Sequence, residues 1–321
     1  MTRNYITNYS NNQDIYSRVP RNWIKLAQIA GTFFSLLGLI FYIYYMKDIY
    51  NSLSNNDFVK KSIVSLLLSI ITYFVWKSIY NAIIIIRLVN KCSDEELCAN
   101  RYIISSLSLT IGGLFTPFLI TSFPNVDTMS TIKPRYFLSK TMGFCTLIGA
   151  PILTFCYFFS LLVEINSVNP EFIFNTNSVM GIISILVLII GLITFILGLT
   201  TTKLFSSNKL TNDLDYSNYS KLLKIISIIW MTILTVELVI VILFSIIRLI
   251  SALADLFRTR EESGGIIMAF LVLLNLFFTI SCVWMVIYVT TRTIAGLWSI
   301  DGFVRIKRYK HNKYTYTQNI Y

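Results

Sequence analysis

The sequence has few of the residues from which most enzyme active sites are built. Histidine occurs once, as His311, and neither a Walker loop nor a Gly-x-Ser-x-Gly elbow is present. One histidine excludes histidine-based triads and histidine–glutamate zinc proteases. The five cysteines are scattered, and Cys92 and Cys98 have no neighbouring histidine with which to complete a tetrahedral zinc site. We therefore expect no enzyme activity, no cofactor and no metal centre.

Charged residues are scarce as well: they make up 13% of the chain, against about a quarter in soluble domains. Hydrophobic residues reach 55%, and the mean hydropathy is +0.66. Several uninterrupted runs are long enough to cross the roughly 30 Å hydrocarbon core of a bilayer as helices. A soluble fold is excluded because its surface could not hide so much apolar area. The composition predicts an integral membrane protein.

The net charge of +11 is concentrated in the connectors between apolar runs and in the final segment. Charge placed there indicates membrane orientation and headgroup contact, so we expect no nucleic-acid partner. Five basic residues fall within nine positions of the final segment, and each is worth about 1 kcal/mol beside an anionic leaflet. The residues expected to contact lipid headgroups are Arg305, Lys307, Arg308, Lys310 and Lys313.

Six apolar segments predict an all-α, polytopic transmembrane helix bundle that forms one domain. The spans are expected at about 27–46, 62–86, 142–164, 179–202, 225–247 and 266–290. The bundle, 27–290, follows a polar segment 1–25 and precedes a basic tail 292–321. The first apolar run begins near Ala27 without a small-residue cleavage site, so it predicts a retained anchor. In the fourth span, small residues at heptad spacing (Ser184, Gly191 and Gly198) predict a close-packing seam.

A seventh segment, 102–123, is uncharged and long enough to cross, yet it is rich in Ser, Thr, Gly and Pro. If it enters the membrane and returns, 20 Lys and Arg residues lie on the cytoplasmic side and 6 outside. If it crosses, the numbers are 16 and 10. We favour six spans plus a re-entrant or interfacial segment, with both termini cytoplasmic. The alternative is seven spans, with only the C-terminus cytoplasmic.

Two charged residues lie inside predicted spans. Glu237 is near the middle of its span, where a carboxylate costs roughly 2.5–3.5 kcal/mol to insert and usually faces the bundle interior. It is either a proton- or cation-coupling group or a structural glutamate that fixes helix packing. Lys77 is the candidate partner of Glu237, but we expect its ammonium to extend toward the nearer interface instead.

The re-entrant candidate contains a second possible site. Gly112, Gly113 and Thr116, followed by Pro117, provide a break point and free backbone carbonyls that could ligate a cation. The simpler interpretation is that these residues mark a kink. The candidate intramembrane polar site therefore consists of Glu237, Lys77, Gly112, Gly113 and Thr116.

Four short motifs are distinctive: Thr116-Pro117-Phe118, Phe123-Pro124-Asn125-Val126-Asp127, Lys133-Pro134-Arg135-Tyr136-Phe137 and Trp298-Ser299-Ile300-Asp301-Gly302. With them the chain resembles uncharacterised multi-pass membrane proteins of mollicutes. The resemblance covers about a third of the chain. It implies a multi-pass protein in the cell membrane of a wall-less bacterium, and it implies no activity, substrate or site residues.

Two functions are compatible with these features. The midplane carboxylate and the breakable segment 102–123 predict a transporter or permease-like protein. The scarcity of intramembrane charge, the small-residue seam and the basic tail fit a non-transporting scaffold or accessory subunit. The expected partners are the lipid bilayer with its anionic headgroups, and a second membrane protein or another copy of the chain.

Overall fold

Six long helices dominate the computed structural model, which describes residues 19–53, 58–110, 113, 116–121, 123, 134–164, 173–207, 221–261 and 266–300. Within these ranges the chain is helical, with short turns and no β-strand. All six long helices are long and apolar enough to cross a membrane. The predicted all-α transmembrane bundle with six spans is confirmed, and the chain is an integral membrane protein.

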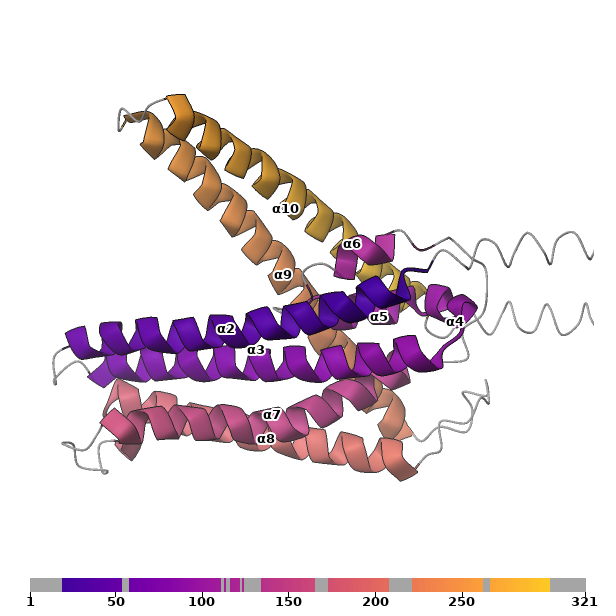
Figure 1. The fold of residues 1–321 in the computed structure, drawn as a ribbon. Helices are drawn as coiled ribbons and strands as arrows, with labels where there is room; N and C mark the ends of the chain where they lie inside the picture. Colours follow the sequence, from indigo (N-terminus) through magenta and orange to yellow (C-terminus); the bar gives the residue numbers. More distant parts are fainter. Residues whose placement is uncertain are drawn as a thin grey trace, which may run out of the picture.

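The six helices form three antiparallel hairpins, and the two helices of each hairpin lie side by side (Figure 1). They are α2 (Arg21–Ser52) with α3 (Phe58–Lys91), α7 (Pro134–Glu164) with α8 (Val179–Ser207), and α9 (Lys221–Glu261) with α10 (Ile266–Ile300). Each helix is longer than the apolar run that predicted it, since hydropathy detects the hydrocarbon core while the helices continue beyond it. The predicted seven-span alternative has no counterpart among these helices.

The predicted close-packing seam on α8 faces α7. A Cβ atom on Gly191 would collide with the Thr154 hydroxyl of α7, and one on Gly198 would collide with the α7 backbone. Ser184, the third seam residue, shares a 3.0 Å hydrogen bond with the buried Tyr157 hydroxyl. The seam is confirmed, because only small residues allow the two backbones to approach this closely.

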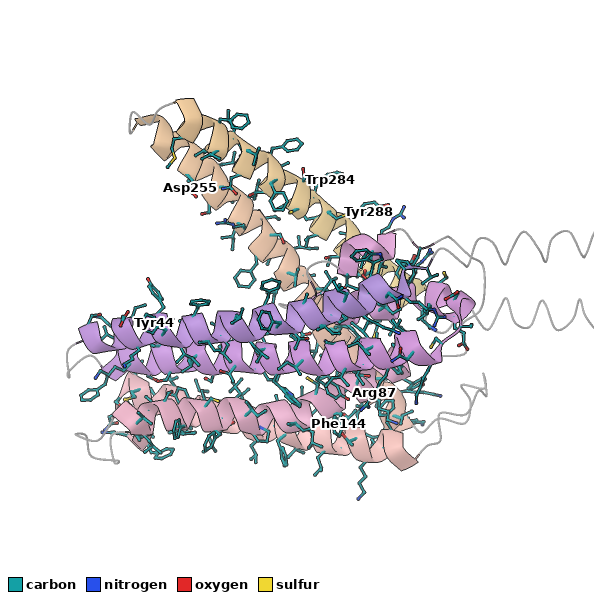
Figure 2. The ribbon with its side chains drawn as sticks, viewed as in Figure 1. Tyr44, Arg87, Phe144, Asp255, Trp284 and Tyr288 are labelled. Carbon is teal, nitrogen blue, oxygen red and sulfur yellow. The ribbon has the colours of Figure 1, made fainter. Side chains whose placement is uncertain are left out.

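The α9–α10 hairpin diverges from the other two (Figure 1). In α9, buried side chains are frequent up to Leu238, and beyond it Ala252 is the one buried residue among those whose burial is described. We call residues 239–261 and 266–288 the α9–α10 arm. Its surface is apolar and open: Phe277 is 74% exposed, and Trp284 (Figure 2) is 72% exposed. The arm packs on itself, and its base joins the rest of the bundle.

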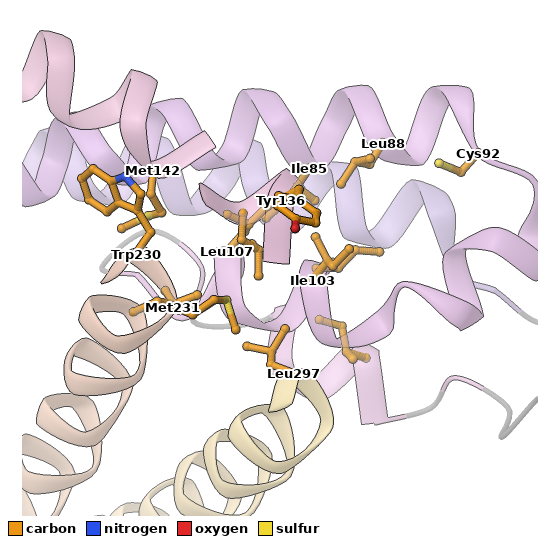
Figure 3. Close-up of a cluster of buried hydrophobic side chains, with 14 of the residues drawn as sticks. Ile85, Leu88, Cys92, Ile103, Leu107, Tyr136, Met142, Trp230, Met231 and Leu297 are labelled. Carbon is orange, nitrogen blue, oxygen red and sulfur yellow. The ribbon is translucent and has the colours of Figure 1, made fainter. Parts of the chain in front are cut away.

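Three short helices connect α3 to α7: α4 (Asp94–Ala99), α5 (Arg101–Ser108) and α6 (Thr116–Thr121). Helix α5 packs between α3 and α10, and α6 packs against α2, α5 and α10. Ile103 and Leu107 of α5 lie at the centre of the main apolar core, to which α3, α7, α9 and α10 also contribute (Figure 3). At eight residues, α5 spans about 12 Å and is too short to cross a bilayer.

One arginine fixes the end of the core where α2 begins. Arg21 donates hydrogen bonds to the carbonyl oxygens of Val89 and Cys92, each at 2.8 Å, and forms an ion pair with Asp94. A cation is favourable at this position because the last carbonyls of α3 carry a partial negative charge. The contact holds the start of α2, the end of α3 and the start of α4 together.

Candidate functional site

The two charged residues inside predicted spans form an ion pair with each other. The Lys77 ammonium contacts the Glu237 carboxylate and links α3 to α9. Lys77 lies 14 residues before the end of α3, and Glu237 lies 16 residues after the start of α9. At 1.5 Å per residue, the two are about 21 and 24 Å along their helices from those ends. The Lys77 side chain is only 5% exposed, so the expectation that it extends to the interface is wrong. Glu237 provides a partner at the same depth, which removes the need to reach water.

The pair has one closed and one partly open side. Tyr73 on α3 and Cys145 on α7 lie close enough to Glu237 to interact with it electrostatically. The Trp76 indole donates a 3.1 Å hydrogen bond to the Cys145 carbonyl and closes the side toward α7. The Glu237 side chain keeps 24% of its surface exposed. The pair therefore sits where α3, α7 and α9 meet, at the base of the α9–α10 arm.

The segment after α4 enters the bundle through α5. In the middle of α5, the Ser105 hydroxyl shares a 2.6 Å hydrogen bond with Thr293, which lies seven residues, or about 10 Å along the helix, from the end of α10. At its end, the Leu107 carbonyl accepts a 3.1 Å hydrogen bond from the Asn81 amide, ten residues or about 15 Å from the end of α3. Both contacts lie toward the end of the bundle where α3 and α10 end.

The segment then turns back. Thr110 donates a 3.3 Å hydrogen bond to Ser78, 13 residues or about 20 Å from the end of α3. Thr116, at the start of α6, accepts a hydrogen bond from the Gln28 amide, seven residues or about 10 Å from the start of α2. These contacts all lie toward the end of the bundle where α2 begins. The described residues of 102–123 form no spanning helix, as expected of a re-entrant or interfacial segment, and Thr110 contacts Ser78, the neighbour of Lys77.

Of the candidate residues in the break, Gly113 has a defined steric role. A Cβ at this position would overlap the Ser108 carbonyl oxygen, so the turn that follows α5 requires glycine. Thr116 is fully buried and lies on the returning side. Gly112 lies outside the described residues, as do the basic tail residues Arg305, Lys307, Arg308, Lys310 and Lys313.

The sequence analysis missed three buried polar side chains of this site: Gln28, Asn81 and Thr290. All are at most 2% exposed. The Asn81 Oδ1 and the Thr290 hydroxyl have no hydrogen-bond partner in the described part of the chain. Asn81 lies one helical turn after Lys77, so the two share a face of α3. The four-residue spacing between Lys77 and Asn81 was the one feature of the sequence that could have pointed to Asn81. Both the ion pair and the contact with Leu107 lie on this face of α3.

Comparison of the chain with protein-family models, with curated proteins and with solved structures found no match. Among the described residues, no group of three or more His, Cys, Asp or Glu side chains could hold a metal ion.

Proposed function

We propose that this protein is a permease-like transporter of a small polar or charged solute, and that the Lys77–Glu237 pair controls its conformational change. The observation that carries the proposal is an ion pair between the central parts of two predicted spans, with Thr110 of segment 102–123 bonded to the neighbouring Ser78. Ionisable residues inside membranes are costly and usually belong to substrate or ion pathways. Non-helical backbone at membrane depth is tolerated where it is buried in protein or lines water.

The position of the pair suggests how it acts. Glu237 lies at the point where α9 leaves the bundle, one residue before the last buried side chain at the base of the arm. With the pair formed, α9 is linked to α3 in addition to packing against α7. When a proton or a cation takes over the charge of Glu237, this contact is lost and the arm is free to rotate about its base. Such a hinge between helical hairpins is a common way to switch access to a binding site.

Flux through vesicles tests the proposal without knowledge of the solute. We would reconstitute the full chain into liposomes and follow H⁺ and Na⁺ movement after imposing a gradient of each ion. Wild-type vesicles should dissipate at least one gradient faster than protein-free vesicles, and Glu237→Gln should remove the difference. Asp48→Asn is the matched control because it also neutralises one carboxylate, on an exposed position of α2. Wild-type vesicles that match protein-free vesicles for both ions would contradict the proposal.

The arm favours a second candidate function, a scaffold or accessory subunit. Its described surface is mostly apolar, with Phe277 and Trp284 among the most exposed side chains, and the arm diverges from the other two hairpins (Figure 1). Another membrane protein or a second copy could pack against the arm through van der Waals contacts, as membrane helices do. Cross-linking in native membranes through Trp284→Cys would give a defined larger species if this function is correct.

We further propose that the protein lies in the cell membrane with both termini in the cytoplasm. Six crossings put both ends of the chain on one side, and that side carries 20 of the Lys and Arg residues against 6 on the other. The resemblance to membrane proteins of wall-less bacteria supports the same location.

A further inference from the structure

One buried amide in the site is only half satisfied. Asn81 is 1% exposed, and its Nδ2 donates to the Leu107 carbonyl at 3.1 Å. Its Oδ1 has no hydrogen-bond partner among the residues that the structure describes. Buried polar atoms are almost always paired, so an unpaired one indicates a missing water, ion or ligand.

The amide points at the end of a helix that attracts cations. Helix α5 ends at Ser108, and Leu109 leaves the helical conformation with φ −76° and ψ 60°. The last carbonyls of a helix carry a partial negative charge equivalent to about half an electron. In membrane proteins, the C-terminal ends of interrupted helices coordinate Na⁺ in the same way. The Asn81 Nδ2 now occupies the position beside the Leu107 carbonyl, and a half-turn of the amide would put the unpaired Oδ1 there, next to a second oxygen ligand.

We propose that Asn81 and the end of α5 form a binding site for a monovalent alkali cation. Its ligands include the Asn81 Oδ1 and the Leu107 carbonyl oxygen, once the amide turns so that its oxygen, in place of its nitrogen, faces Leu107. Oxygen ligands select hard cations. The two ligands are neutral, and the nearby Glu237 charge is already balanced by Lys77, so the site favours one positive charge over two.

The role of this cation site rests on the proposed transport function, in which it would bind the coupling cation. Asn81 lies one helical turn from Lys77. Side chains at this spacing are about 5–6 Å apart at their Cβ atoms. The net charge of the Lys77–Glu237 pair therefore affects cation affinity. Glu237→Gln leaves an unbalanced ammonium and should weaken binding about tenfold or more, and Lys77→Met leaves a carboxylate and should strengthen it.

Equilibrium binding of ²²Na⁺ to the purified full chain tests the site independently of transport. We expect saturable binding to wild type and a melting temperature that rises in NaCl relative to choline chloride at equal ionic strength, with KCl and LiCl as further arms. Asn81→Ser should abolish both effects. Asn275→Ser is the matched control, because Asn275 is an exposed intramembrane asparagine on α10, and it should bind like wild type.

These measurements distinguish a failure of the cation site from a failure of the transport function. If no alkali cation binds saturably, or if Asn81→Ser binds like wild type, the site is wrong. If Asn81→Ser does not fold, the opposite shifts expected for Glu237→Gln and Lys77→Met decide, and equal affinities would overturn the site. Cation binding that persists in a protein without flux would overturn the transport function and leave the site in place.

Discussion

The ion pair between α3 and α9 can be tested by a double-mutant cycle, and its burial predicts an unequal result for the two single variants. Glu237→Gln leaves the Lys77 ammonium uncompensated in a position that is 5% exposed. Removing one partner of a buried pair in this way costs about 3–5 kcal/mol. Lys77→Met leaves a carboxylate that is 24% exposed and therefore partly solvated, so we expect about half that loss.

The double variant Lys77→Met/Glu237→Gln leaves no buried charge and should be more stable than the two single losses added together predict. We expect a coupling free energy of about 2 kcal/mol, within the range for residues in direct contact. The assay is reversible unfolding in mixed micelles, followed by tryptophan fluorescence. Asp48→Asn with Lys203→Met removes two exposed charges on different hairpins and should be additive. Additivity of the Lys77 and Glu237 variants within about 0.5 kcal/mol would refute the pair.

Three further predictions follow from the re-entrant segment and its surroundings. Gly113→Ala should destabilise the protein by about 2 kcal/mol or more in thermal unfolding, because its Cβ would overlap the Ser108 carbonyl, while Gly38→Ala meets nothing within 4 Å and should not. Burial and the Glu96 carboxylate raise the pKa of the Cys92 thiol, with Arg21 opposing them. Glu96→Gln should lower that pKa and speed alkylation of Cys92 at pH 8, since more thiolate is present; an unchanged rate would contradict this. Reporter fusions at the two termini should show both on the same side of the membrane, and opposite sides would contradict six crossings.

Hydropathy located the six spans because each buries a continuous apolar run in lipid, a property that every residue of the run shares. Helix ends were less predictable: α9 was expected over 225–247 and extends over Lys221–Glu261. The helix continues for as long as its backbone hydrogen bonds do, whatever the side chains contact. The charge distribution succeeded for segment 102–123 because crossing or returning changes the side of every later charge.

The pairing of Lys77 with Glu237 could not be derived from the sequence. The two residues are 160 positions apart, and their contact depends on which helices meet and at what depth. Gln28 and Asn81 escaped notice for a related reason. Neither side chain has a polar partner close to it in sequence, and only the positions of α5 and α6 reveal that both have partners in segment 102–123.

Because the α9–α10 arm diverges from the other hairpins, the contacts at its base determine how the arm is oriented. In water, burial of apolar area would fix how the arm lies, but in a bilayer lipid tails are as apolar as the helices, and this driving force is absent. The orientation of the arm is therefore set where it makes polar and close-packed contacts. Those contacts include the Lys77–Glu237 pair, which links α9 to α3, and the hydrogen bond between Thr293 of α10 and Ser105 of α5.

The length of the arm amplifies any change at that base. From Glu237 to the end of α9 there are 24 residues, or about 36 Å of helix, so a rotation of about 10° at the base moves the far end by about 6 Å. The re-entrant segment joins the same base through the hydrogen bond between Ser105 and Thr293. A cation bound at Asn81 would act on the charge of the pair from one turn away. Cation binding and the position of the arm are thus linked through the same few contacts, and any ligand that changes one must change the other.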